Sequence, residues 1–311
     1  MRIIITGGGG LIGRALTNSL LHDEHEVIIL SRTPERVKDL PSGARAVQWD
    51  GKTPHGLGEL VEGASAVVNL AGENIAGEGF FPDRWTDERK RRIRSSRLNA
   101  GKAVTQTIQA AGYKPGVLVQ VSAIGYYGPS DDQVVTEDNP PGEDFMAEVC
   151  QGWENSTAGV EELGVRRVVT RGSVALSTEG GAFTRFLFPF KLYAGGPLGS
   201  GKQYISWIHM ADQVSAIRHL IEDQMARGAY NLSSPNPVTN KEFTQTIGKV
   251  MGRPSFIPVP EFAFRTMFGE VATVVVDGQR VLPKRLQELG YEFKFPALEP
   301  AIRDILRKRE R

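Results

Sequence analysis

The chain opens on Arg2-Ile3-Ile4-Ile5-Thr6-Gly7-Gly8-Gly9-Gly10-Leu11-Ile12-Gly13, and this stretch decides its fold. Residues 2–6 are mostly β-branched and apolar on both faces, which is typical of a central strand in a parallel sheet. Residues 14–21 follow with the apolar spacing of a helix, and residues 26–30 form a second apolar run. The order of strand, glycine turn, helix and strand predicts the first unit of a dinucleotide-binding domain.

Each glycine of the turn has its own expected task. Gly7 lets the chain turn sharply out of the strand, and Gly13 lets the helix pack closely on the sheet. Gly10 lets the backbone approach a pyrophosphate, whose charge is favoured at the helix start formed by Leu11 and Ile12. A tight surface loop is the alternative interpretation. The strand before the turn and the helix after it favour cofactor binding.

The end of the second apolar run indicates which dinucleotide binds. An NAD site usually carries an acidic residue there for the ribose 2′-hydroxyl, whereas an NADP site offers an arginine to the 2′-phosphate. This sequence has Ser31-Arg32 and no acidic residue before Glu35. Arg32 can pair with the phosphate in a fork, and Ser31 can donate a hydrogen bond. The alternative is that Arg32 is a solvated turn residue. NADP(H) is therefore the predicted cofactor.

Two further strand ends are expected at the same edge of the sheet. Residues 44–50 form a strand that ends on Trp49-Asp50, where Asp50 either accepts a hydrogen bond from the adenine amino group or caps the turn before Gly51. Residues 66–70 form another strand, which runs into small residues that leave room for a ligand. The predicted cofactor contacts of these ends are Trp49, Asp50, Leu70, Ala71, Gly72 and Glu73.

Composition excludes several classes of partner. The 311 residues include 37 Lys+Arg and 36 Asp+Glu, so the net charge of +1 argues against nucleic-acid or membrane binding. Residues 84–97 are rich in arginine, but a solvated helix explains them better than a nucleic-acid patch. The single cysteine, Cys150, cannot form an internal disulfide, and no apolar stretch approaches the length of a membrane span. We expect a cytoplasmic protein with a small-molecule substrate.

The rest of the chain predicts an α/β fold, a Rossmann-like doubly wound parallel sheet with a smaller C-terminal substrate lobe. Residues 1–170 are expected to form the NADP-binding domain. Residues 171–311 are expected to form mainly the substrate-facing lobe, with residues of about 207–233 returning to the first domain. The helix that contains residues 84–97 is expected to end near Gly112, and Thr239 and Gly252 are expected to bound a helix over 240–251.

The sequence resembles the extended short-chain dehydrogenase/reductases. More narrowly, it is similar to their atypical NADP(H)-binding branch of epimerase family proteins, which are nucleoside-diphosphate-sugar epimerase-like. The stretches that carry the resemblance cover the chain from end to end: Thr6-Gly7-x-x-Gly10-x-x-Gly13, Asn69-Leu70-Ala71-Gly72-Glu73-Asn74-Ile75, Tyr127-Gly128, Cys150-x-x-Trp153-Glu154, Gly199-x-Gly201-x-Gln203-x-x-x-Trp207-Ile208-His209-x-x-Asp212 and Leu282-Pro283-x-x-Leu286-x-x-x-Gly290-Tyr291. The resemblance implies a Rossmann-like domain with a small C-terminal lobe.

The resemblance also implies a catalytic set, from which this sequence departs. Redox members use a serine, and a tyrosine and a lysine spaced Tyr-x-x-x-Lys, to move a proton while hydride transfers to or from nicotinamide. Ser122 stands at the serine position. Phe145 and Val149 stand where the tyrosine and the lysine are expected, and neither can transfer a proton.

Other residues are candidates to replace the missing pair. Tyr126 and Tyr127 follow Ser122 closely, although the interpretation in which the Tyr-Gly pair only shapes the loop is favoured over a catalytic one. Glu148 and Cys150 share the helix of the missing pair, and His209 titrates near neutrality. The histidines show no metal-ligand spacing with acids or cysteine, so no metal site is expected.

Two functions remain open at the level of sequence. The first is an NADP(H)-dependent oxidoreductase or epimerase that acts on an unknown carbonyl or hydroxyl substrate, possibly one like a nucleotide sugar. The second is a non-catalytic NADP(H)-binding sensor or regulatory protein. The glycine- and aromatic-rich loops over 180–209 favour the first, and the missing tyrosine and lysine favour the second. Because the resemblance is to enzymes, the first function is slightly favoured and the second is the alternative. A homodimer is compatible with either function.

Overall fold

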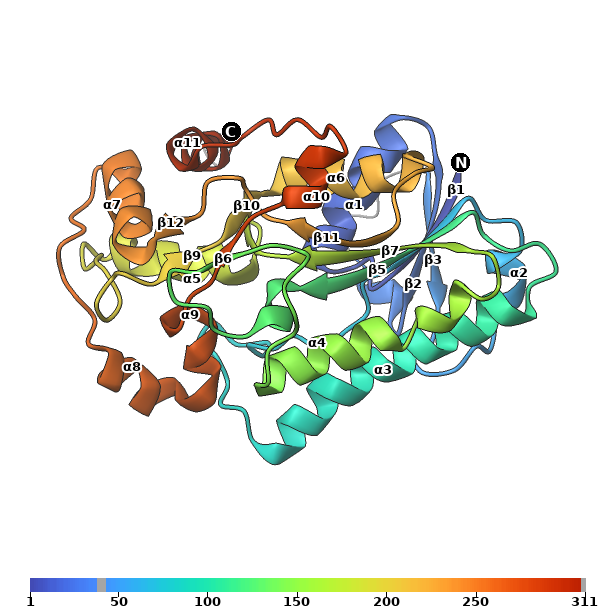
Figure 1. Cartoon of the computed structure of the whole chain (residues 1–311), viewed down its shortest axis with the longest axis horizontal. Helices are drawn as coiled ribbons and strands as arrows, with labels where there is room; N and C mark the ends of the chain where they lie inside the picture. The colour runs from blue at the N-terminus through green and yellow to red at the C-terminus, as the bar shows by residue number, and fades with distance from the viewer. Residues whose placement is uncertain (38–42, 309–311) are drawn as a thin grey trace.

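The computed structural model describes residues 1–37 and 43–308, and its centre is a seven-stranded sheet (Figure 1). Every neighbouring pair of strands in this sheet is parallel, as predicted. The strands are β1 (Arg2–Thr6), β2 (Glu26–Ser31), β3 (Ala44–Gln48), β4 (Ala66–Asn69), β5 (Val117–Ala123), β7 (Arg166–Gly172) and β11 (Gly228–Leu232). Their order across the sheet is β11-β7-β5-β4-β1-β2-β3. The first three strands are added on one side of β1 and the later ones on its other side, so the strand order reverses between β1 and β4. Ligands bind at the carboxyl ends of strands beside such a reversal.

Helices cover both faces of the sheet because its strands are apolar on both sides. Ile3 and Ile5 of β1 pack in one core, and Ile4 between them packs in the other, as the two-residue period of a strand requires. The first core is covered by α1 (Leu11–His22), α6 (Met210–Glu222) and α10 (Lys284–Glu288). The second is covered by α2 (Gly58–Val61) and α3 (Asp87–Ala110), and α4 (Phe145–Asn155) lies along α3 on the same side (Figure 1).

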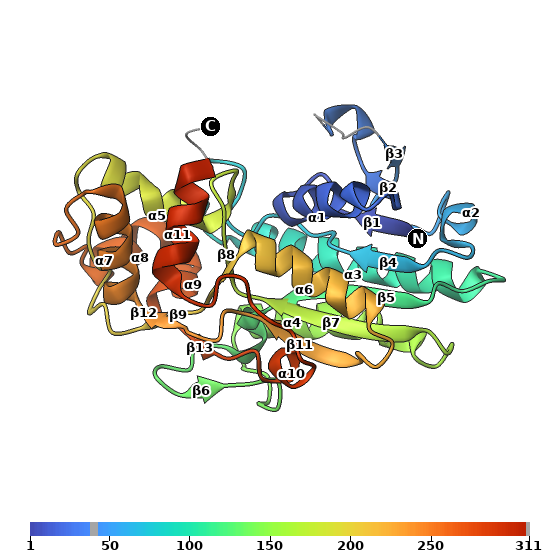
Figure 2. The same ribbon diagram turned by 90° about the horizontal axis from the view of Figure 1, so that it is seen from above.

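A second lobe lies beyond the carboxyl ends of the strands (Figure 2). Its helices are α5 (Gly181–Lys191), α7 (Asn240–Met251), α8 (Glu261–Phe268), α9 (Thr273–Val276) and α11 (Leu298–Lys308). Its short strands pair as β8 (Val174–Leu176) with β10 (Trp207–His209), β9 (Tyr204–Ile205) with β12 (Val238–Thr239), and β6 (Val134–Val135) with β13 (Arg280–Val281). One apolar core centred on Phe183, Trp207 and Phe243 holds α5, α7 and α11 together.

The chain crosses between the lobes more often than the sequence indicated. The boundary predicted near residue 170 falls inside β7, and α6 and β11 lie with the sheet. Residues 286–293 also pack on the sheet core, although they were expected in the second lobe. Asp212 holds this segment, because its carboxylate accepts hydrogen bonds from the Lys294 and Phe295 N–H groups at 2.7 and 2.9 Å. Two distant sequence motifs thus meet in one contact.

Local helix signals agree closely with the structure. The helix predicted over 240–251 is α7, with the Thr239 hydroxyl capping its start and Gly252 in the left-handed conformation at its end. The arginine-rich helix is α3, which begins after Thr86 and reaches Ala110. Among the residues that the structure describes, no helix is long and apolar enough to cross a membrane.

Candidate functional site

Three glycines shape the turn between β1 and α1, each for a different reason. Gly7 has a φ of +66°, and a side chain there would lie 2.9 Å from the backbone of Leu70. A side chain on Gly13 would lie 2.5 Å from the Cα atom of Gly8. Gly10 is exposed, and its side chain would meet only the Gly7 carbonyl oxygen, at 3.3 Å. The fold therefore requires Gly7 and Gly13, and Gly10 keeps the outer surface of the turn open.

The first turn of α1 begins at this open surface. Gly10 is its N-cap in an extended conformation, and no side chain caps the helix. The N–H groups at Leu11 and Ile12 therefore have no side-chain acceptor, which suits the charge of a phosphate. The Leu11 side chain also lies against the second lobe, because a side chain on Gly181 would come within 3.0 Å of it.

Ser31 and Arg32 lie where the sequence predicts the 2′-phosphate. Ser31 is the last residue of β2, and its hydroxyl accepts a hydrogen bond from the Thr33 N–H group at 3.2 Å. Arg32 is exposed, and its aliphatic part lies beside Gly51 in the turn after β3. No residue in the described part of the chain forms an ion pair with Arg32. The structure thus leaves a cation at the end of β2.

Trp49 and Asp50 have local structural roles in the turn after β3. The buried Trp49 ring donates a hydrogen bond to the Thr53 carbonyl oxygen at 2.7 Å. The Asp50 carboxylate accepts hydrogen bonds from the Lys52 and Thr53 N–H groups, which hold its pKa below the usual value. Asp50 therefore caps its own turn, as one of the two sequence interpretations had it. Its contact with an adenine stays a prediction.

A buried chain of polar side chains fixes the ends of β1, β4 and β5 relative to one another. The Thr6 hydroxyl donates to Asn69 at 2.6 Å and accepts from the Ala71 N–H group at 3.2 Å. The Asn69 amide then donates to Gln120 at 2.8 Å. These bonds position Leu70, Ala71 and Gly72 directly after β4, at the edge where the sequence predicts the cofactor.

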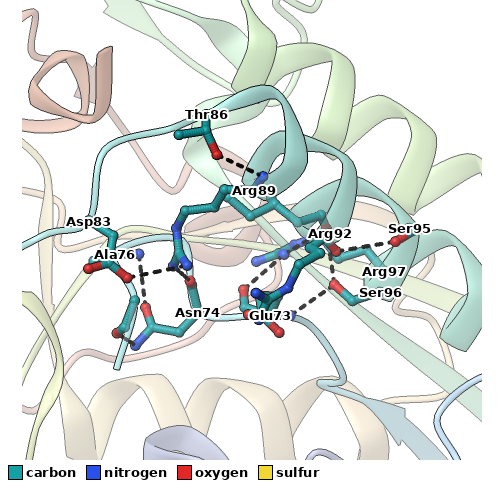
Figure 3. Close-up of polar contacts among 12 residues, drawn as sticks. Glu73, Asn74, Ala76, Asp83, Thr86, Arg89, Arg92, Ser95, Ser96 and Arg97 are labelled. Atoms are coloured by element: carbon teal, nitrogen blue, oxygen red, sulfur yellow. Dashed lines mark hydrogen bonds and ion pairs between the residues drawn. The ribbon is translucent and has the colours of Figure 1, made fainter. Parts of the chain in front are cut away.

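The arginines of α3 hold the loop that follows β4, a role that sequence reasoning missed (Figure 3). The Glu73 N–H group donates to the Ser96 hydroxyl at 3.0 Å, and the Glu73 carboxylate pairs with Arg92 at 2.5 Å. Arg89 donates to the Asn74 carbonyl oxygen at 2.7 Å. The basic run 84–97 is thus not simply solvated, because Arg89, Arg92 and Arg97 bind the loop that follows β4. It anchors the loop that carries Glu73.

Arg97 is a further arginine of α3 whose role sequence reasoning missed. It is 8% exposed, and burial lowers its pKa to about 10. One terminal nitrogen donates to the Glu73 and Ile93 carbonyl oxygens, each at 3.0 Å, and no described carboxylate pairs with it. A side chain on Gly72 would lie 3.1 Å from its guanidinium carbon, so Arg97 lies against the predicted cofactor edge. Its helical register with Ile93, Ala100 and Val104 was the available signal, since those residues form the buried stripe of α3.

Ser122 lies near the carboxyl end of β5, and its hydroxyl is buried. The residue is 3% exposed, and its side chain contacts the thiol of Cys150 on α4. Burial raises the pKa of the Cys150 thiol to about 11, so this sulfur stays protonated at neutral pH. The pair links β5 to α4 and offers no exposed group for proton transfer.

The two tyrosines that follow Ser122 belong to a second buried network. The Tyr127 hydroxyl donates to Asn231 at 2.7 Å and accepts from Arg171 at 2.9 Å, and burial raises its pKa to about 12. The Tyr126 ring lies under the same guanidinium, whose carbon is 3.4 Å from the ring centroid. Arg171 is in turn paired with Glu154. This geometry favours the interpretation in which the Tyr-Gly pair shapes the loop.

The positions of the missing tyrosine and lysine are filled by apolar packing. Phe145 packs edge-on against Trp85 with ring centroids 5.2 Å apart, and the Lys90 ammonium lies 5.0 Å from the Phe145 centroid. Val149 is fully buried in the same cluster. Glu148 is exposed and paired with Arg94. Phe145 and Val149 thus have packing roles, and Glu148 lies in an exposed ion pair.

His209 is the N-cap of α6 rather than a group of the cofactor edge. Its Nδ1 atom accepts a hydrogen bond from the Ala211 N–H group at 3.0 Å, and its Nε2 atom lies 3.3 Å from Asp304. Its ring also stacks on Phe295, with centroids 3.9 Å apart. Across residues 1–37 and 43–308, no cluster of histidine, cysteine and acidic side chains is suited to hold a metal ion.

A groove of about 460 Å³ runs between α1, α6 and residues 176–179. Leu11 is the one predicted cofactor residue that lines it. Arg218, the arginine of the groove, is already paired with Asp23 and Glu222. The groove is therefore distinct from the edge that carries Arg32 and Gly72.

Comparisons with known proteins agree with this geometry. A family model described as the NAD dependent epimerase/dehydratase family matches residues 3–233, and a second, described as a domain of unknown function, matches residues 259–305. The epimerase family protein SDR39U1 homolog, chloroplastic, of Arabidopsis thaliana is 40% identical over 98% of this chain and 87% of its own length. The epimerase family protein YfhF of Bacillus subtilis is 37% identical over 100% of this chain and 99% of its own.

Two solved structures show the same arrangement of elements. The crystal structure of human epimerase family protein SDR39U1 (isoform 2) with NADPH has a TM-score of 0.87 and 35% identity, and covers 99% of each chain. The dTDP-glucose 4,6-dehydratase DesIV of Streptomyces venezuelae, with NAD and TYD bound, has a TM-score of 0.76 and 21% identity, over 100% of this chain and 97% of its own. The second likeness concerns the fold alone.

Proposed function

The chain belongs to the NAD-dependent epimerase/dehydratase family, and from this membership we propose that it is an NADP(H)-binding protein that does not use the Ser–Tyr–Lys mechanism of redox members. The crystal structure of human epimerase family protein SDR39U1 with NADPH supports the cofactor assignment. The bound dinucleotide would supply a hydride donor or acceptor.

Arg32 is the observation that carries the cofactor assignment. It is an exposed arginine at the carboxyl end of β2, where an NAD site would place an acid. Arg32 and Ser31 would hold the 2′-phosphate, because an arginine binds a phosphate in a planar fork and a serine donates one further hydrogen bond. The turn at Gly10 and the start of α1 would hold the pyrophosphate. Arg97 would add a positive charge beneath Gly72 at the same edge.

Four side chains argue against the Ser–Tyr–Lys mechanism. Ser122 and Tyr127 have buried hydroxyls, and Phe145 and Val149 have no transferable proton. A role in sensing the cofactor, or in presenting it to a partner, needs only the binding half of the site. We therefore rank this role first.

An NADP(H)-dependent oxidoreductase or epimerase of a carbonyl or hydroxyl substrate is the second candidate. Arg97 is the specific observation that favours it. A buried guanidinium with no described carboxylate partner can stabilise negative charge on a substrate oxygen at low dielectric. In that case the proton on the product alcohol would come from water rather than from Ser122 or Tyr127. A small-molecule ligand, a homodimer and a cytoplasmic location remain part of this proposal.

Replacing Arg32 by alanine tests the cofactor assignment. NADPH affinity is expected to fall by about 10- to 100-fold, since charge-assisted hydrogen bonds contribute about 1.5–3 kcal/mol. NADH affinity is expected to stay unchanged, because NADH lacks the 2′-phosphate. Titrations that follow nicotinamide fluorescence measure both affinities. Arg45→Ala, which removes an exposed arginine from β3, is the matched control. An equal loss for NADPH and NADH would contradict the assignment of Arg32.

Replacing Ser122 by alanine tests the mechanism. Any rate of NADPH oxidation with a panel of neutral ketones is expected to be the same in the wild type and in Ser122→Ala, because the hydroxyl is buried against Cys150. Arg97→Met is the comparison variant. A rate that falls with Ser122→Ala would overturn the proposed absence of the Ser–Tyr–Lys mechanism. A rate that falls with Arg97→Met alone would favour the second candidate.

A further inference from the structure

The order of the strands indicates where each half of the cofactor lies. Arg32, the proposed partner of the 2′-phosphate, follows β2, and the turn proposed for the pyrophosphate joins β1 to α1. In the sheet, β2 and β4 lie on opposite sides of β1. A dinucleotide that runs from the end of β2 across the end of β1 therefore extends next over the end of β4. Its nicotinamide half is expected beside the residues that follow β4.

The first residues after β4 border the glycine turn directly. A side chain on Gly7 would lie 2.9 Å from the backbone of Leu70. Gly72 follows two residues later and is exposed. A side chain on Gly72 would lie 3.1 Å from the guanidinium carbon of Arg97 and 3.3 Å from its Nε atom. The guanidinium of Arg97 thus lies directly behind Gly72, on the side of the turn where the nicotinamide half is expected.

Arg97 brings a positive charge that its surroundings do not cancel. It is buried, and no carboxylate within residues 1–37 and 43–308 forms an ion pair with it. The carboxylate of the neighbouring Glu73 is already paired with Arg92 at 2.5 Å (Figure 3). The Trp153 ring, 4.8 Å from the guanidinium carbon, carries no charge. Because a guanidinium keeps its proton at neutral pH, a net positive charge stands behind Gly72.

The two redox forms of the cofactor differ in charge at the nicotinamide ring. The ring of NADP⁺ carries a positive charge and the ring of NADPH is neutral, whereas the phosphate groups are the same in both forms. A buried cation repels the oxidised ring, since like charges interact more strongly inside a protein than in bulk water. The attraction between this cation and the phosphates is common to both forms and cancels from the ratio of their affinities.

We propose that Arg97 makes the site discriminate between the two redox forms and bind NADPH more tightly than NADP⁺. The inference rests on the proposed function, because it needs the dinucleotide at this edge of the sheet. It deepens the sensing role, since a protein that senses the redox state of the cofactor must distinguish the two forms. Discrimination of this kind requires no proton transfer, in agreement with the buried hydroxyls of Ser122 and Tyr127.

The test compares two dissociation constants of the full chain. NADPH binding is followed by nicotinamide fluorescence, and NADP⁺ binding by the displacement of NADPH. The wild type is expected to bind NADPH at least about tenfold more tightly, as two like charges about 10 Å apart at an effective dielectric constant of about 20 require. Arg97→Met, which removes the charge and keeps an unbranched side chain, is expected to reduce this preference about tenfold. Arg97→Lys keeps the charge and is expected to retain the preference.

Three controls separate the charge of Arg97 from other effects. Arg91→Met removes an exposed arginine from the same helix, α3, and is expected to leave the preference unchanged because solvent screens that charge. Arg32→Ala is expected to weaken NADPH and NADP⁺ equally, since both carry the 2′-phosphate. Adenosine 2′,5′-bisphosphate lacks the nicotinamide half, and Arg97→Met is expected to leave the affinity for it unchanged.

The possible failures can be told apart. If the wild type bound neither NADPH nor NADP⁺, the proposed function itself would be wrong. Equal affinity of the wild type for the two forms would overturn only the role of Arg97, and this result needs no variant that folds. The same preference in the wild type and in a folded Arg97→Met variant would overturn it as well. Weaker binding of adenosine 2′,5′-bisphosphate to Arg97→Met would place Arg97 beside the adenosine half and would also overturn it.

Discussion

Replacing Gly10 by alanine is expected to lower the affinity for NADPH by about 100-fold while the protein remains folded. The side chain would stand on the exposed surface of the turn, where the backbone must approach the pyrophosphate. Loss of two charge-assisted hydrogen bonds of about 1.5 kcal/mol each corresponds to a change of this size. The fold tolerates the substitution, since Gly10 has an ordinary extended conformation and its new side chain meets one atom at 3.3 Å.

Gly9→Ala provides the matched control for this prediction. Gly9 is the adjacent glycine, is also exposed, and its side chain would make only ordinary contacts with Val37 from 3.5 Å. We expect Gly9→Ala to retain NADPH affinity in the same fluorescence titration, and both variants to melt at temperatures close to that of the wild type. Equal NADPH affinity in the Gly10→Ala variant and the wild type would show that the turn is a structural loop and not the pyrophosphate site.

Replacing Arg171 by methionine is expected to lower the free energy of unfolding by about 3–5 kcal/mol, because it strands a buried carboxylate. Arg171 and Glu154 are 5% and 7% exposed, and two hydrogen bonds of 2.9 Å join the guanidinium to the two carboxylate oxygens. The Tyr127 hydroxyl would lose a donor as well. Urea unfolding followed by circular dichroism measures the change.

Two further variants show whether burial causes the loss. Arg94→Met removes an arginine of α3 from its exposed pair with Glu148, which lies on α4 as Glu154 does, and is expected to cost less than about 1 kcal/mol. Arg171→Met combined with Glu154→Leu is expected to recover most of the lost stability, since no buried charge is then left alone. A similar loss for Arg94→Met and Arg171→Met would contradict the role assigned to burial.

The cofactor half of the site was predictable because its signals are local. The turn that requires Gly7 and Gly13 and leaves Gly10 open spans only a few residues, and Arg32 follows its strand directly in the sequence. The same holds for the helix between Thr239 and Gly252, whose capping residues touch it. In each case the residues that interact are neighbours along the chain, so their spacing carries the information.

The catalytic candidates were not predictable in the same way. A strand pattern in the sequence indicates that successive side chains alternate between the two faces of the sheet, but it does not indicate which helix covers a given face. Ser122 faces Cys150 because α4 packs there, and Tyr127 meets Asn231, which is 104 residues away in the sequence. Only the departure at Phe145 and Val149 was visible beforehand, and the structure explains it by apolar packing with Trp85.

The sequence by itself determined the parallel sheet, the glycine turn and the arginine at the end of β2, because backbone geometry and short-range capping dictate these features. Tertiary structure alone decided the use of each polar side chain. It placed Arg92 of α3 against Glu73 and buried Arg97 beneath Gly72. It also brought Arg185 of α5 within hydrogen-bond distance of the Phe80 and Gly79 carbonyl oxygens. The physical reason is that charged and aromatic side chains reach partners across the fold, and burial decides which of those contacts form.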